Sequence, residues 1–319
     1  MNLDAFAITE VGCVREHNED DCLLLPDEQL FVVADGMGGH ACGEVASRIS
    51  VESLEAFYSD PNLTAQLEKA YHELREDGRL TDLSSFHEFR LRSAIEYGNL
   101  QIFREAGTDP QLEDMGTTIV SLAFVGSRVY VGHVGDSRAY RYRQGRLFRL
   151  TEDHSLANEY IRMRVLRPED LPQFPYKNVI VRALGLQEDV VVDTYYRTSR
   201  PGDRYMLCSD GLTDLVDDEE IFEILAAWPG AANAANELCR RALAYGGIDN
   251  VTVLVVDIRD ELDQGRATHA VDARALSETN EYPRVRPPTG VDDTIEAPAI
   301  QTEYVLPTDP LPTATKNDE

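Results

Sequence analysis

The chain has 319 residues, and its 57 acidic and 30 basic side chains give a formal charge of −27 and a pI of about 4.5. This excess of negative charge excludes a nucleic-acid binder that works through a basic face, because a polyanion would be repelled. A hydrophobic fraction of 43% is typical of globular proteins, and no run approaches the roughly 18 apolar residues of a membrane span. No secretory signal is recognisable and the five cysteines form no paired motif, so we expect a cytoplasmic protein with reduced thiols.

Short strands are predicted throughout the first 260 residues. Each is a run of β-branched and aromatic residues bounded by glycine, aspartate or asparagine. They cover residues 5–14, 30–34, 117–125, 128–134, 139–143, 190–196, 204–209 and 251–258. The short links Gly126-Ser127 and Gln144-Gly145 predict that the segments on either side of each pair antiparallel, as hairpins.

Amphipathic helices are predicted in two groups. The first comprises residues 43–58 and 86–105, with a further helix around 64–75, and the second comprises residues 218–228 and 232–245. Strands and helices are grouped rather than alternating, which favours an α+β fold of antiparallel sheets with helices packed outside.

Residues 261–319 differ in composition from the rest. They hold 12 acidic and 5 basic residues and 7 of the 15 prolines, with few aliphatic clusters. Such a segment cannot bury enough apolar surface to offset the entropy of ordering, so it is predicted to be a disordered tail. A phosphorylation target, a docking arm and an inert end all fit this composition.

Four aspartates stand at the ends of predicted strands: Asp35, Asp136, Asp210 and Asp249. If the strands bring them to one edge of a sheet sandwich, the carboxylates repel one another unless divalent cations neutralise them. Ligand sets made only of oxygen favour Mg²⁺ or Mn²⁺ over zinc. The alternative is that each Asp-Gly or Asp-Asn pair simply forms a turn.

An ordered series of motifs extends this pattern. The motifs are GCVREHNED at 12–20, VADGMGGH at 33–40, MGTT at 115–118, GHVGDSRAY at 132–140, LTEDHSL at 150–156, NVIVRALG at 178–185, LCSDGLTD at 207–214 and DNVTV at 249–253. In this order and spacing, the chain resembles the bacterial branch of the protein phosphatase 2C family, the metal-dependent serine/threonine protein phosphatases. The resemblance covers about residues 5–258.

The resemblance implies an α-β-β-α sandwich with a flap subdomain at about residues 155–177, within a phosphatase domain of residues 1–260. It implies two or three Mn²⁺ or Mg²⁺ ions as cofactors. Carried over by position, Asp35 bridges two metals, the Gly36 carbonyl binds one, and Asp210 and Asp249 complete the shell. Asp136 and Asp210 provide a third site, while Glu19 and Asp20 act through water or from behind the ligands.

Catalytic roles follow from the same resemblance. Arg15 is expected to hold the phosphate, since a guanidinium can bind two phosphate oxygens at once. A metal-bound hydroxide is expected to attack phosphorus directly, and either His40 or a metal-bound water protonates the leaving oxygen. His133 and His154 lie inside motifs, and we expect structural roles for both.

The expected substrates are proteins carrying phosphoserine or phosphothreonine, added by a cognate serine/threonine kinase. Two other functions compete with this one. The first is a catalytically inactive phospho-binding regulatory module on the same fold, which should lack at least one metal carboxylate. The second is a metal-dependent phosphodiesterase or nuclease, which the charge of −27 disfavours.

Overall fold

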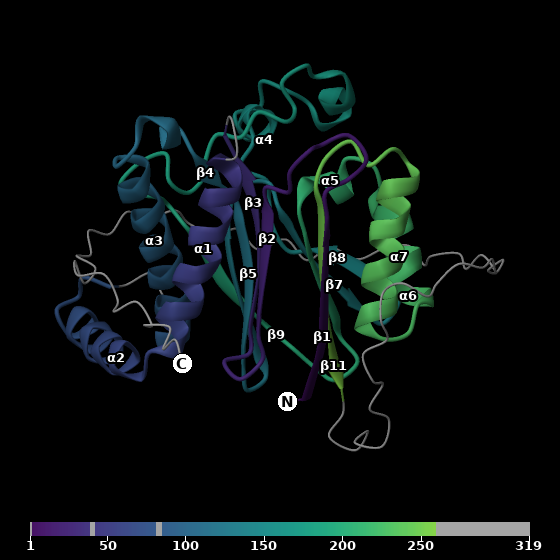
Figure 1. The fold of residues 1–319 in the computed structure, drawn as a ribbon. Coiled ribbons are helices and arrows are strands. Elements are labelled where there is room, and N and C mark those ends of the chain that lie inside the picture. Colours follow the sequence, from purple (N-terminus) through teal and green to yellow (C-terminus); the bar gives the residue numbers. More distant parts are fainter. Residues whose placement is uncertain (1, 39–41, 81–84, 260–319) are drawn as a thin grey trace, which may run out of the picture.

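Two antiparallel sheets lie face to face in the computed structural model, which describes residues 2–38, 42–80 and 85–259 (Figure 1). The first sheet has the order β1 (Asn2–Glu10), β11 (Val251–Arg259), β10 (Arg204–Cys208), β7 (Arg138–Arg143) and β8 (Arg146–Arg149). The second has the order β2 (Asp20–Leu25), β3 (Leu30–Met37), β5 (Ile119–Val125), β6 (Arg128–Val134) and β9 (Asp193–Thr198), and β4 (Gly116–Thr117) pairs with β3.

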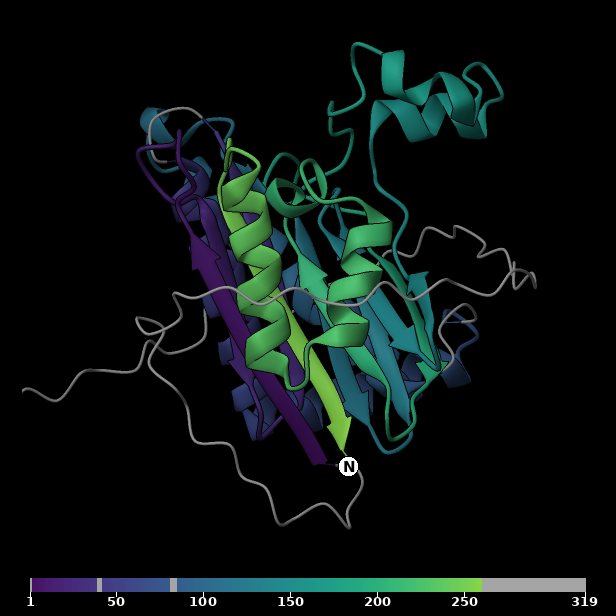
Figure 2. The same cartoon turned by 90° about the vertical axis from the view of Figure 1, so that its right-hand side faces the viewer.

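Helices cover both outer faces of this sandwich (Figures 1 and 2). The second sheet is covered by α1 (Cys42–Ser59), α2 (Pro61–Glu76) and α3 (Phe86–Ala106), and the first by α6 (Asp218–Ala227) and α7 (Ala231–Ala244). The remaining helices are short: α4 (Leu156–Arg162), α5 (Asp210–Thr213) and the 3₁₀ turns Pro110–Leu112 and Pro168–Gln173. The α-β-β-α sandwich implied by the resemblance is therefore confirmed.

The layer order explains why the strands are apolar on both faces. In β3, Leu30 and Val32 pack among the residues of α1 and α3, while Phe31 and Val33 point into the space between the sheets. A strand alternates its side chains between two faces, and both faces of β3 are buried. Both faces of β11 are buried in the same way, so its residues 251–256 are all apolar except Thr252.

Both predicted hairpin links are confirmed. Residues 126–127 join β5 to β6 and residues 144–145 join β7 to β8, each pair antiparallel. Gly126, Gln144 and Gly145 have φ of 58°, 50° and 73°, the left-handed values that suit the twist of a two-residue hairpin.

Several strand predictions need correction. The strand predicted over 190–196 is Asp193–Thr198, and the one predicted over 117–125 is divided into β4 and β5.

The first strand ends at Glu10 instead of continuing to Val14, because the chain turns at Gly12, where φ is 83°. A Cβ at Gly12 would lie 2.2 Å from the Asp249 carbonyl oxygen, so this turn packs directly against the segment that leads into β11 at the same end of the sheet. The acidic strand β2 was not predicted.

The helix predicted around 64–75 exists and is longer, as α2. It begins at Pro61, after Asp60 accepts hydrogen bonds from the backbone N–H groups of Asn62 and Leu63. An N-cap aspartate followed by proline at the first helical position is a strong helix start.

None of the helices in the described part of the chain combines the length and hydrophobicity needed to cross a bilayer.

Residues between β8 and β9 project beyond the sandwich (Figure 2). They carry α4, which Ser155 caps by accepting from the Asn158 N–H, and the 3₁₀ turn Pro168–Gln173. Positive charge in this segment is partly neutralised locally, since Arg162 pairs with Glu159 and Arg167 with Asp170. The projection starts beside the end of β6, where the His154 N–H donates to the Gly135 carbonyl at 2.8 Å.

Candidate metal centre

Strand directions bring the four aspartates to one end of the sandwich. Asp35 lies near the end of β3, and Asp136 follows the end of β6, which runs parallel to β3 because β5 separates them antiparallel. Asp210 follows β10 and Asp249 precedes its antiparallel neighbour β11, so these two also meet at one end. The four come from chain segments up to 214 residues apart and share one edge.

The proximity of these carboxyl groups perturbs their ionisation. Burial, and after it repulsion by its aspartate neighbours, raises the pKa of Asp35 well above its usual range. The same two causes raise the pKa of Asp136 to about 7 and that of Asp210 to about 6. Buried carboxyl groups that repel one another are the arrangement a bound cation stabilises.

Asp136 provides the test of whether a cation fits. Its Oδ1 atom is buried and has no hydrogen-bond partner among the described residues. Buried polar atoms are nearly always paired in folded proteins, so an orphaned carboxylate oxygen needs a partner of another kind. Together with the neighbouring carboxylates, it makes an all-oxygen donor set that suits Mn²⁺ or Mg²⁺.

Gly36 allows the chain to approach this edge closely. A Cβ at Gly36 would lie 2.1 Å from the carbonyl oxygen of Gly43, the second residue of α1. The Gly36 N–H donates to the Glu19 carbonyl at 3.0 Å, which fixes the peptide next to Asp35. A side chain at position 36 would push α1 away from the aspartate edge.

Glu19 and Asp20 stand directly behind the aspartates. Asp20 pairs with Asp35 across β2 and β3, and its Oδ2 accepts from Ser209 Oγ at 2.7 Å. Burial is the main cause that raises the pKa of Asp20 to about 7, and burial also raises the pKa of Glu19. Asp20 thus links the two sheets at this edge.

Arg15 lies at the mouth of the site, in the loop between β1 and β2. Its Nη2 donates to Asp249 Oδ2 at 2.7 Å, and its side chain is 48% exposed. The hydrogen bond to Asp249 is the main cause that raises its pKa, and the charges of Glu19 and Asp35 contribute. The structure therefore brings Arg15 to the aspartate edge, while His40 lies outside the described residues.

Two positioning residues were missed at the level of sequence. Asn250 donates from Nδ2 to the carbonyls of Val11 and His17, at 2.9 Å each, and accepts from the Glu19 N–H at 2.8 Å. Thr118 Oγ1 accepts from the Asp35 N–H at 3.2 Å and lies 2.7 Å from Ser137 Oγ. Both stood in quoted motifs, DNVTV and MGTT, but nothing in those motifs revealed their partners.

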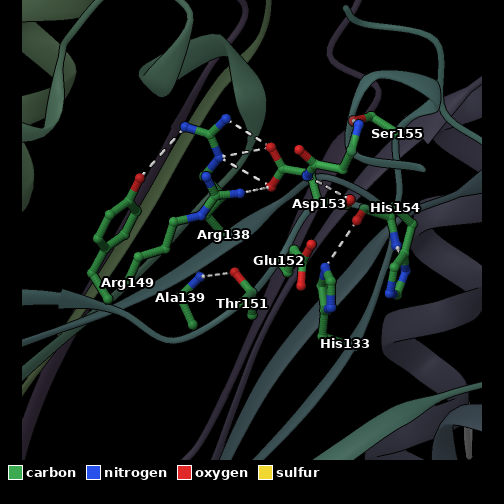
Figure 3. Close-up of polar contacts among 12 residues, drawn as sticks. His133, Arg138, Ala139, Arg149, Thr151, Glu152, Asp153, His154 and Ser155 are labelled. Atoms are coloured by element: carbon green, nitrogen blue, oxygen red, sulfur yellow. Dashed lines mark hydrogen bonds and ion pairs between the residues drawn. The ribbon is translucent and has the colours of Figure 1, made fainter. Parts of the chain in front are cut away.

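His133 and His154 are both buried, as expected for structural roles. With Asp193 they form a group whose ligand atoms lie within 4.8 Å of one another. Their ring nitrogens are engaged with the peptide of Gly135 and with Asp193. Figure 3 shows the pair beside Asp153.

This chain matches a family model and is similar to several known phosphatases. Residues 14–244 match the sequence model of the family described as protein phosphatase 2C. The serine/threonine phosphatase stp of Listeria monocytogenes EGD-e is 36% identical over 261 residues, which make up 81% of this chain and 96% of that protein. The serine/threonine protein phosphatase PstP of Mycobacterium tuberculosis H37Rv is 38% identical over 271 residues, covering 85% of this chain and 48% of that protein.

Solved structures give the same result. The crystal structure of the M. tuberculosis serine/threonine phosphatase PstP/Ppp is similar with a TM-score of 0.70 at 36% identity, covering 81% of this chain and 99% of that one. A second structure, the PstP catalytic domain in complex with two manganese ions, has a TM-score of 0.67 at 36% identity, with the same coverage.

Proposed function

The chain belongs to the protein phosphatase 2C family, and we propose that the aspartates at its sheet edge hold Mn²⁺ or Mg²⁺ for hydrolysis of phosphoserine and phosphothreonine. It is a metal-dependent serine/threonine protein phosphatase. The observation that carries the assignment of the site is the buried Asp136 Oδ1, which has no partner in the described chain and lies in the field of Asp210.

The proposed ligands are Asp35, the Gly36 carbonyl, Asp210 and Asp249, with Asp136 and Asp210 serving a third ion. Bound ions of this kind supply an activated water and neutralise charge that develops on the phosphoryl group. Glu19 and Asp20 support the site from behind, where Asp20 is held by Ser209. Four carboxylates at one edge disfavour the alternative of an inactive binding module.

Arg15 is the proposed phosphate-binding residue. Its guanidinium is partly exposed at the mouth and keeps N–H donors beyond the one used on Asp249. A planar guanidinium that binds two phosphoryl oxygens fixes phosphorus for in-line attack. His40 remains one of two proposed proton donors, the other being water.

No covalent phosphoenzyme is proposed. Cys208 is buried beside the edge, and burial raises the pKa of its thiol to about 12, so it stays protonated. Ser209 Oγ donates to Asp20 and accepts from the Thr252 N–H, so its proton and one lone pair are engaged. We therefore propose water as the nucleophile that attacks phosphorus.

Several wider assignments belong to the same proposal. The phosphatase domain comprises residues 1–260 with a flap at about 155–177, and residues 261–319, which lie outside the described residues, form a tail. Substrates are phosphoproteins that a cognate serine/threonine kinase produces. The protein is proposed to act in the cytoplasm.

A titration of Mn²⁺ against activity on a phosphothreonine peptide tests the proposal. Turnover should require Mn²⁺ or Mg²⁺, stop with chelator and be lost in Asp210→Asn. A phosphodiester substrate and a single-stranded DNA should not be hydrolysed. Metal-independent turnover of the peptide, or preference for the diester, would overturn the assignment.

A further inference from the structure

Two buried histidines hold the backbone N–H and carbonyl of Gly135, the residue before a proposed metal ligand. His133 Nε2 lies 2.8 Å from the Gly135 carbonyl oxygen, and the Gly135 N–H donates to His154 Nδ1 at 3.0 Å. The two rings are 4.3 Å apart between centroids, at an angle of 34°. Both polar groups of Gly135 are thus fixed by imidazoles, directly before Asp136.

These contacts determine the tautomers. A carbonyl only accepts, so His133 Nε2 carries a proton, and an N–H only donates, so His154 Nδ1 carries a lone pair. Neutral His154 then has its proton on Nε2, which donates to Asp193 Oδ2 at 3.1 Å. Burial, followed by the neighbouring His154, lowers the pKa of His133 to about 3, so this ring is neutral.

Asp193 is a suitable anchor for His154. Burial opposes its ionisation, but the hydrogen bond from His154 and the charge of Arg182 hold its pKa below the usual range. Arg182 Nη1 donates to Asp193 Oδ1 at 2.8 Å. An ionised carboxylate on the far nitrogen fixes both the tautomer and the orientation of an imidazole.

The same contacts argue against a metal at this histidine pair. A cation on His154 Nε2 would have to displace the proton donated to Asp193, and Arg182 lies 3.0 Å from that nitrogen. A cation on His133 Nε2 would break its bond to Gly135. The arrangement therefore orients a peptide and does not bind an ion.

The backbone around His154 is itself rigid. Its N–H donates to the Gly135 carbonyl at 2.8 Å, and its carbonyl accepts from Val181 at 2.9 Å. The preceding Asp153 accepts from both Arg138 and Arg149 (Figure 3). The His154 ring is consequently held by the hydrogen bonds of its own backbone, by the ion pairs of Asp153 and by its Nε2 contact with Asp193.

Asp136 needs this support because its own Oδ1 has none among the described residues. Gly135 has φ of 109°, and a Cβ there would lie 2.5 Å from Thr118 Cβ, so the turn is tight and glycine is required. Because Asp136 Oδ1 has no hydrogen-bond partner in the described chain, we expect its direction to depend on the backbone at Gly135.

We propose that His154, oriented by Asp193, is a positioning residue that aims Asp136 at its metal by fixing the backbone N–H of Gly135 and with it the tight turn that leads into Asp136. This rests on the proposed role of Asp136 as a ligand. The essential atom is His154 Nδ1, which accepts from Gly135. His154 itself touches neither metal nor substrate.

A pair of substitutions separates the two ring nitrogens. An asparagine amide reaches about as far as Nδ1 and can still accept from Gly135, whereas a glutamine amide reaches about as far as Nε2 and cannot. Binding of Mn²⁺ alone to the full chain is measured by calorimetry. His154→Gln should weaken the Mn²⁺ site to which Asp136 contributes, which we expect to be the weakest, by about tenfold or more. His154→Asn keeps the acceptor for Gly135 but loses Asp193, so it should weaken this site by less than about tenfold.

Asp136→Asn is the control, and it should abolish the weakest site. If it binds Mn²⁺ as the wild type does, the proposed ligand role of Asp136 is wrong. If Asp136→Asn loses the site but His154→Gln does not weaken it, the positioning role is wrong. Equal weakening by both His154 variants would also overturn it, because ring packing would then be the cause.

Asp193→Ala keeps the inference testable if the buried substitutions prevent folding. Asp193 is 49% exposed, so its loss should leave the fold intact while freeing the His154 ring. We expect weaker Mn²⁺ binding at the third site by about threefold to tenfold at an unchanged melting temperature. Unchanged affinity in this variant would contradict the proposal.

Discussion

The guanidinium of Arg15 and the carboxylate of Asp249 are in contact, 2.7 Å apart between Nη2 and Oδ2, although 234 residues separate them. One is the proposed phosphate holder and the other a proposed metal ligand. The contact therefore places the proposed phosphate site directly beside the proposed metal site. It also shows that Arg15 is held at the mouth by charge.

Substitution of Arg15 should impair turnover more than folding. Loss of charge-assisted hydrogen bonds to phosphate is worth about 1.5–3 kcal/mol, so Arg15→Ala should lower kcat/KM for a phosphothreonine peptide roughly 10- to 100-fold. Arg15→Lys should retain only part of the wild-type kcat/KM, because an ammonium cannot bind two oxygens in one plane. The exposed Arg146, in the hairpin at the opposite end of the sheet, provides the control. Equal rates in Arg15→Ala and Arg146→Ala would contradict the role.

Much of the fold could be predicted because both faces of the central strands are buried. That burial makes runs such as Leu30–Met37 apolar until the aspartate at their end, where the site begins. The edge strand β2 escaped prediction because it starts with two aspartates and is only partly buried. Only its pairing with β3 identifies it as a strand.

Positioning residues could not be predicted for a different reason. Asn250 acts on Glu19, 231 residues away, and His154 acts on a peptide 19 residues away. Such bonds depend on tertiary contacts, and an isolated asparagine or histidine carries no periodic signal. The carboxylates were found because strand ends and glycine turns mark them locally.

The conservative variant Asp35→Asn should separate activity from stability. Turnover should fall at least about 100-fold, because a bridging carboxylate is lost. The metal-free protein should melt at the same temperature or higher, since a carboxylate whose pKa burial and repulsion raise is replaced by a neutral amide. Mn²⁺ should no longer raise the melting temperature. A strongly destabilised variant would point to a structural role instead.

Stability of the metal-free protein should fall as pH rises. Burial and repulsion place the pKa of Asp136 at about 7 and of Asp210 at about 6, above the ordinary 3.8. Between these limits the folded state binds more protons than the unfolded state, so the free energy of unfolding decreases with increasing pH. The contribution is complete below pH 3.8 and is lost once pH exceeds about 7.

Thermal melts at pH 5.5 and 8.0 test this sign. Without metal, the melting temperature should be lower at pH 8.0, by roughly 2 °C or more. Saturating Mn²⁺ should raise it more at pH 8.0 than at pH 5.5, because binding displaces protons from the same carboxyl groups. Asp136→Asn should reduce the pH dependence. A metal-free protein that melts higher at pH 8.0 would refute the electrostatic account.

Asn250 offers a test of how the phosphate site is held. Its three hydrogen bonds to Val11, His17 and Glu19 fix the loop that carries Arg15, and the residue is buried. Asn250→Ala should cost about 2–4 kcal/mol of unfolding free energy by leaving those backbone groups unpaired. It should also lower kcat/KM for the peptide, because the guanidinium is no longer positioned.

A double-mutant cycle distinguishes this from a general loss of stability. If Asn250 acts through the loop, Arg15→Ala should cost less in the Asn250→Ala background than in the wild type, since the contribution of Arg15 is already impaired. The Asn250→Ala and Arg146→Ala effects should simply multiply. Independent effects of Arg15 and Asn250, measured below the melting transition, would mean that the loop is positioned by other contacts.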